Sequence, residues 1–145
     1  MPYMKEFGWD SHILAVDPAY VSNEKDPLLE KTLPAEVKTT LVKPLNEKWT
    51  RKVSFGSLGL RCYRALQKAG NQMLAGGNIN LVFFSTTEFP VIGLGVGWKA
   101  RFGVPFVFDL QDPWVSDYYG DPEAPSPPGG CLKYSMMQAL AKFQE

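Results

Sequence analysis

The segment VPFVFDLQDPW, residues 104–114, combines a run of strand-forming residues with a polar end. Its first half is rich in β-forming residues with no alternation of polar and apolar side chains, which is typical of a strand covered on both faces. Asp109 ends this run, and Asp112, Pro113 and Trp114 follow almost at once. We therefore predict a buried strand over 104–110 with two carboxylates and a tryptophan at its tip.

Composition sets the broad class of the protein. The chain has 145 residues, of which 45% are hydrophobic and 21% charged, which indicates one globular domain with room for a core. Lys plus Arg (15) equals Asp plus Glu (15). We predict no nucleic-acid partner, because such proteins usually carry a basic excess.

Neither a signal peptide nor a spanning helix is predicted. No apolar segment follows the first residues, and the longest apolar stretch, 89–108, is interrupted by Lys99, Arg101 and Pro105. We expect a cytoplasmic protein, with a peripheral membrane contact left open.

Metal and cofactor sites are not expected either. Cys62 and Cys131 are the two cysteines, and no CxxC motif is present, so we predict no zinc site and no cofactor. We favour two free thiols over a disulfide, which the sequence leaves open. His12 begins the apolar run HILAV, and we interpret it as a structural residue rather than a ligand or base.

Periodicity and breakers predict the elements of the first half. Residues 2–7 look like the last turn of a helix capped by Gly8. HILAV (12–16) is a short buried strand, Asp26 caps a short helix over 26–33, and 37–44 is a strand near a sheet edge. The clearest helix spans 57–75, where apolar residues recur every three or four positions before Gly76 and Gly77.

The second half alternates strand and helix. INLVFFS (79–85) is a continuous apolar strand, and STTE then begins a helix that reaches about Phe102, with Pro90 in its first turn and Gly103 as its cap. The Pro/Gly-rich segment 120–130 is a loop, and helical spacing resumes over 132–145.

This order predicts an α/β fold, a Rossmann-like open parallel sheet flanked by helices. We expect 12–16, 79–85 and 104–109 to be parallel neighbours in one sheet, flanked by the helix at 57–75. In this division, 1–119 is the Rossmann-like domain, 120–130 a loop, and 131–145 the C-terminal helix of the same domain.

Ligands of open parallel sheets bind at the carboxyl ends of the strands, and two such ends are polar here. Ser85, Thr86 and Thr87 follow the first of these strands, where three hydroxyls and helix N–H groups can hold an anion or a sugar hydroxyl. The alternative is that one threonine simply caps the helix.

The second polar end has a carbohydrate-binding composition. Asp112 can accept a proton or bind a hydroxyl, and Trp114 can stack on a sugar ring. The same set includes Asp109, Gln111, Tyr118 and Tyr119. The alternative is that Asp112 and Pro113 form a turn and that Trp114 packs beneath a loop.

The glycines of GLGVG (93–97) do not fit a dinucleotide-binding fingerprint. That motif is GxGxxG and opens directly from a strand, whereas position 98 is Trp and the run lies well after the strand. We interpret these glycines as sites of close helix–sheet packing, at about 1 kcal/mol each in helix propensity.

STTEFPVIGLGVGWKARFGVPFVFDLQDPW resembles the N-terminal domain of GT-B glycosyltransferases of the family 4-like group, in which a strand ends in Asp-x-x-Asp-Pro-Trp. MKEFGWDSHILAV resembles that domain's helix, Gly-Trp turn and second strand. The resemblance covers residues 3–18 and 79–119. It implies sugar transfer from a nucleotide-sugar to a glycan or lipid-linked acceptor, without an essential metal.

The resemblance also assigns roles. It places Asp109, Asp112 and Trp114 at the cleft-facing tip of a strand of the acceptor-side domain, with Asp112 as the candidate catalytic residue. The chain departs from the family because it begins inside the first helix and lacks the donor domain with its Glu-x7-Glu motif. We therefore expect an acceptor-side domain truncated at both ends and inactive alone. The alternative is a non-catalytic α/β binding or interaction module, whose exposed apolar surface drives self-association or partner binding.

Overall fold

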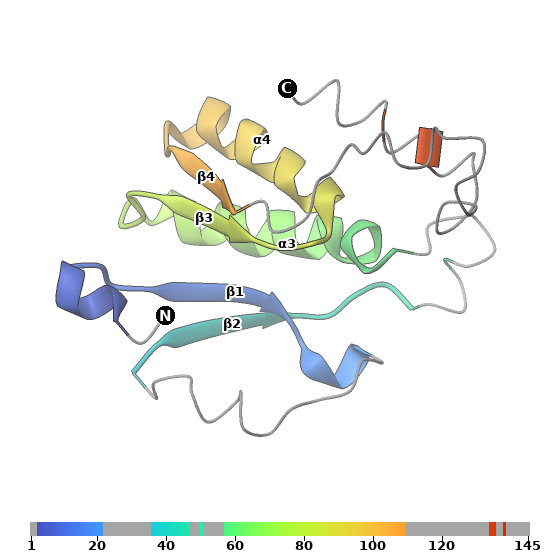
Figure 1. Ribbon diagram of the computed structural model, residues 1–145, viewed down its shortest axis with the longest axis horizontal. Helices are drawn as coiled ribbons and strands as arrows, with labels where there is room; N and C mark the ends of the chain where they lie inside the picture. The colour runs from blue at the N-terminus through green and yellow to red at the C-terminus, as the bar shows by residue number, and fades with distance from the viewer. Residues whose placement is uncertain are drawn as a thin grey trace, which may run out of the picture. The chain divides into compact units, whose positions relative to one another are not determined.

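The computed structural model describes residues 3–21, 36–46, 50, 57–109, 134–135 and 138. The chain divides into two compact units, Met1–Asn78 and Ile79–Glu145. Figure 1 shows the elements of each unit. Both units contain two parallel strands and an α-helix, which confirms the α/β class.

The described part of the first unit contains a parallel pair of strands and a long helix. Strand β1 (His12–Val16) pairs with β2 (Lys38–Val42), from His12 opposite Lys38 to Val16 opposite Val42. Helix α3 (Leu58–Ala75) packs against both strands. Its buried residues recur at spacings of three and four, which places them on one face of the helix: Gly59, Cys62, Leu66, Gly70 and Leu74.

The ends of α3 are set by local chemistry. The Ser57 hydroxyl accepts a hydrogen bond from the Leu60 N–H at 3.3 Å, which satisfies one of the unpaired donors of the first turn. Gly76 follows the last residue, and Gly77 has a φ of 72°, a left-handed conformation that suits glycine. The predicted helix over 57–75 is confirmed.

Short 3-10 helices flank β1. Helix η1 (Met4–Phe7) ends at Gly8, whose φ of 80° confirms the predicted left-handed cap. Helix η2 (Pro18–Tyr20) begins directly after β1, where the Asp17 carboxylate accepts a hydrogen bond from the Ala19 N–H at 2.9 Å. The chain therefore leaves β1 through one tight turn of 3-10 helix.

The second unit is a strand–helix–strand crossover. It contains β3 (Val82–Ser85), η4 (Phe89–Ile92), α4 (Gly93–Phe102) and β4 (Phe106–Asp109). The pair β3–β4 is parallel, as predicted. The predicted single helix begins instead as the 3-10 turn η4, with Pro90 in its first positions. Gly103, with a φ of 71°, caps α4 as expected.

Helix α4 covers one face of this pair at close range. A Cβ added at Gly95 would lie 2.9 Å from Phe106 Cγ and 2.9 Å from Phe84 Cε2. The Phe84 and Trp98 rings stack with centroids 6.0 Å apart, and these side chains are only 7% and 6% exposed. The predicted close helix–sheet packing is thus confirmed at Gly95.

The same prediction is wrong for Gly97, where an added Cβ would meet nothing within 4 Å. Residues two positions apart lie on opposite sides of a helix, so Gly95 and Gly97 cannot both face the strands. Gly97 is exposed.

The other face of β3–β4 carries exposed apolar side chains. Phe83 is opposite Val107 in the register, and alternation along a strand places both on the face away from Phe84. They are 46% and 44% exposed. Parallel pairs are usually covered on both faces, so this face differs from the one beneath α4.

The expected grouping of strands requires a correction. We predicted one sheet containing 12–16, 79–85 and 104–109, but in the described residues β1 is hydrogen-bonded to β2, and β3 to β4, in two separate pairs. The hydrogen-bonded neighbour of β1 is the next strand in the chain, which lies in the same compact unit.

Several predicted elements lie outside the described residues. These are the short helix over 26–33 and the loop at 120–130. Cys131, which we predicted to be a free thiol, also lies outside the described residues. Of the predicted C-terminal helix, Tyr134, Ser135 and Gln138 are helical, and its other residues are outside the described part. The proposed domain boundaries therefore stay a prediction.

Candidate functional site

The carboxyl end of β3–β4 brings two predicted site residues together. Ser85 and Asp109 are the last residues of their strands and stand opposite each other in the parallel register. Paired residues of neighbouring strands lie about 4.8 Å apart, and their side chains project from the same face. The Ser85 hydroxyl and the half-buried Asp109 carboxylate are therefore neighbours at the carboxyl ends of the two strands.

This pair has a defined chemical capacity. A carboxylate accepts hydrogen bonds, and a hydroxyl both donates and accepts them, so together they match two neighbouring hydroxyls of a sugar. A carboxylate at such an edge can also accept a proton from a bound hydroxyl. The pair shares its face with Phe83 and Val107, because alternate residues along a strand project from the same side.

The two threonines after Ser85 have different environments. The Thr86 hydroxyl accepts a hydrogen bond from the Glu88 N–H at 3.0 Å, in the turn that leads from β3 into η4. Thr86 therefore has a structural contact in this turn, but it is not the predicted helix cap, because the N-cap residue of η4 is Glu88 and no side chain caps the helix. Thr87 is exposed and lies at the carboxyl end of β3, where we predicted it.

The remaining predicted site residues lie outside the described part of the chain. They are Gln111, Asp112, Trp114 and Tyr118, together with Tyr119. Their roles, including Asp112 as the catalytic residue, stay predictions.

A second polar strand end was not predicted from the sequence. At the carboxyl end of β1–β2, Lys43 Nζ lies 5.9 Å from the centroid of the Tyr20 ring, a cation–π contact between exposed side chains. Lys43 directly follows β2, and Tyr20 ends η2 after β1. The sequence shows that Tyr20 and Lys43 each follow a predicted strand. It does not show that the two strands pair, so the contact between these side chains could not be predicted.

The His12 side chain contacts the neighbouring strand, and its interpretation as a structural residue stays a prediction. Its Nε2 lies 2.9 Å from Thr40 Oγ1 on the neighbouring strand. The contact joins the amino end of β1 to the middle of β2 and stabilises their alignment. The position lies at the opposite end of β1 from the turn at Asp17.

Among the described residues, Lys5 and Glu36 form an ion pair that shifts the pKa values of both side chains. A hydrogen bond from Lys5, together with its positive charge, lowers the pKa of Glu36, and the same bond raises the pKa of Lys5. Both side chains are exposed, so the pair joins η1 to the turn before β2 without forming a site.

The described ranges contain neither a metal-binding cluster nor a membrane-spanning helix. Within them, no three His, Cys, Asp or Glu side chains are grouped so that they could hold a metal ion. The helices in those ranges are too short or too polar to cross a bilayer.

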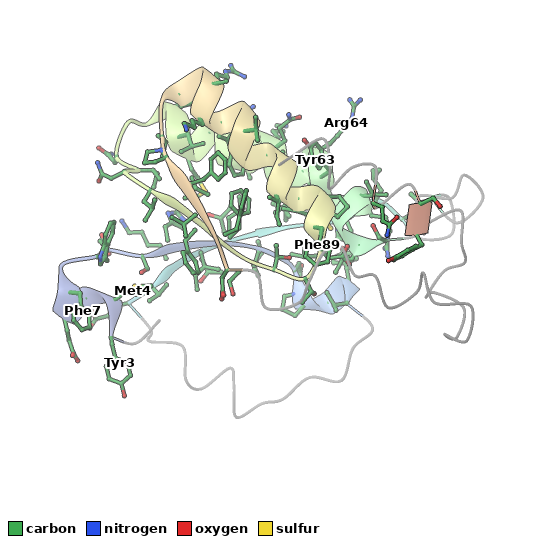
Figure 2. The ribbon with its side chains drawn as sticks, turned by 45° about the horizontal axis from the view of Figure 1, so that its top comes forward. Tyr3, Met4, Phe7, Tyr63, Arg64 and Phe89 are labelled. Atoms are coloured by element: carbon green, nitrogen blue, oxygen red, sulfur yellow. The ribbon has the colours of Figure 1, made fainter. Side chains whose placement is uncertain are left out.

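Tyr3 and Phe7 are exposed around η1, and Figure 2 shows both side chains extending outward from it.

Comparisons with known proteins do not assign this chain to a family. No protein-family model, curated protein or solved structure matches this chain.

Proposed function

We propose that this chain is the N-terminal, acceptor-binding domain of a cytoplasmic GT-B glycosyltransferase of the family 4-like type, with a Rossmann-like open sheet. The observation that carries the proposal is the register of β3–β4, which pairs Ser85 with Asp109 at the carboxyl ends of two parallel strands. Open α/β sheets bind their ligands at this kind of edge.

The proposal assigns the chemistry to the sheet edge. In this proposal, Ser85, Thr87 and Asp109 bind hydroxyls of the acceptor. Asp112 is the general base, and Trp114 stacks on a sugar ring. The partners are a nucleotide-sugar and a glycan or lipid-linked acceptor in the complete enzyme, without nucleic acid. Because the resemblance places the donor site on a second domain, we propose that the 145-residue chain alone does not transfer sugar.

The first experiment tests whether this chain binds nucleotide-sugar donors. Isothermal titration of the chain with UDP- and GDP-sugars at millimolar concentration is expected to give no saturable heat, because the leaving diphosphate is held by the second domain in the family. In enzymes with an oxyanion hole, loss of one well-placed hydrogen-bond donor costs about 10² to 10³ in rate, so the hydrogen-bond donors that hold a charged leaving group contribute strongly to catalysis. Saturable heat that disappears in Asp112→Ala would overturn this proposal.

The second experiment tests the acceptor side. A panel of simple glycosides is screened by ligand-observed NMR, and hits are titrated against the wild type, Ser85→Ala and Asp109→Asn. We expect about tenfold or greater weakening for Asp109→Asn, because a hydrogen bond to a charged group contributes about 1.5–3 kcal/mol. Thr39→Ala is the control, since it removes an exposed hydroxyl from β2. Equal affinities in all four proteins would contradict an acceptor role for this edge.

A second candidate function is a non-catalytic α/β binding or interaction module. The observation that favours it is the exposure of Phe83 and Val107 on the face of β3–β4 that points away from Phe84. Sedimentation equilibrium over a range of concentrations tests self-association through this face. A concentration-dependent dimer that Phe83→Ser disrupts, without glycoside binding, would favour the module over the enzyme domain. A downstream reading frame that encodes a donor domain would favour the enzyme domain.

A further inference from the structure

We draw no further inference here: the strongest candidate, the exposed apolar face of the β3–β4 pair on which Phe83 and Val107 lie opposite each other, is a sheet face without a partner in the described residues, and nothing in the structure shows what covers it.

Discussion

In each unit a helix packs against a parallel pair of strands, but the side chains at the two contacts differ. In the first unit, α3 is long, is capped by a serine hydroxyl, and covers strands that carry His12, Lys38, Thr39 and Thr40. In the second unit, α4 is short and approaches the strands so closely that a glycine faces two phenylalanine rings. The two helices therefore differ in what they pack against: α3 covers strands with several polar side chains, and α4 packs against aromatic rings.

The connection after β2 strengthens this contrast. The Leu45 N–H donates to the Arg61 carbonyl at 3.1 Å, and Arg61 Nε donates to the Leu45 carbonyl at 3.0 Å. The first unit therefore adds polar contacts between its helix and the segment that follows β2. In the second unit, Phe84 instead contacts the rings of Trp98, Phe106 and Phe108.

The largest expected effect separates the two faces of β3. Phe84→Ala removes a buried ring from this cluster and should lower the free energy of unfolding by about 3–5 kcal/mol. Its neighbour Phe83 is the matched control, because the same substitution on the exposed face should change stability by less than about 1 kcal/mol. Urea unfolding followed by circular dichroism measures both. Equal losses would mean that the two faces are equally covered.

The next effect tests the close approach of α4. Gly95→Ala places a methyl group against two packed rings, and overpacking of this kind typically costs about 1–3 kcal/mol. Gly97→Ala has open space around it and should stabilise the helix by about 0.5–1 kcal/mol. The two variants should therefore shift the urea midpoint in opposite directions. A stabilising Gly95→Ala would contradict the packing described here.

A smaller effect is expected at the start of α3. Ser57→Ala leaves the Leu60 N–H without its side-chain acceptor and should cost about 1 kcal/mol. Ser57→Asp keeps an acceptor at the same position and serves as the control. Amide hydrogen exchange of Leu60 should accelerate in the alanine variant alone. Unchanged exchange would show that the cap does not stabilise the first turn.

The smallest effect concerns Glu36. Because Lys5 lowers its pKa, the pair contributes to stability above the pKa of Glu36 in the unfolded chain, and the contribution is lost as the pH falls through the lowered folded value. For Lys5, whose pKa is raised, the contribution is lost as the pH rises through the raised value. NMR titration of the Glu36 carboxyl should show its pKa return to the ordinary range in Lys5→Met. Both side chains are exposed, so salt should weaken the shift.

Local signals in the sequence were sufficient for much of the fold. Gly8 and Gly103 were correctly predicted as left-handed caps, and the apolar spacing of α3 located that helix. The partner of β1 was not predictable, because strand pairing depends on long-range contacts that a single sequence does not display. The distinction between Gly95 and Gly97 was missed because we treated the three glycines as one motif rather than by their positions around the helix.

The candidate site was predictable only in part. The position of Ser85 and Asp109 at strand ends followed from two continuous apolar runs in the sequence, although one face of the strands is exposed. That they stand opposite each other depends on the register, which is set by the crossover between them. The hydrogen bond of Thr86 to the turn could not be distinguished from a ligand contact, because the same Ser-Thr-Thr sequence serves both purposes.

The register of β3–β4 also bears on how the second unit forms. Every pair, from Val82 with Phe106 to Ser85 with Asp109, joins residues separated by the same length of chain. A single loop closure through α4 therefore aligns all of the pairs, and its entropic cost is incurred once rather than at each pair. We expect the strands to associate as one kinetic event, with similar φ-values for substitutions along both of them. Widely different φ-values at the two ends of the pair would show instead that pairing proceeds stepwise.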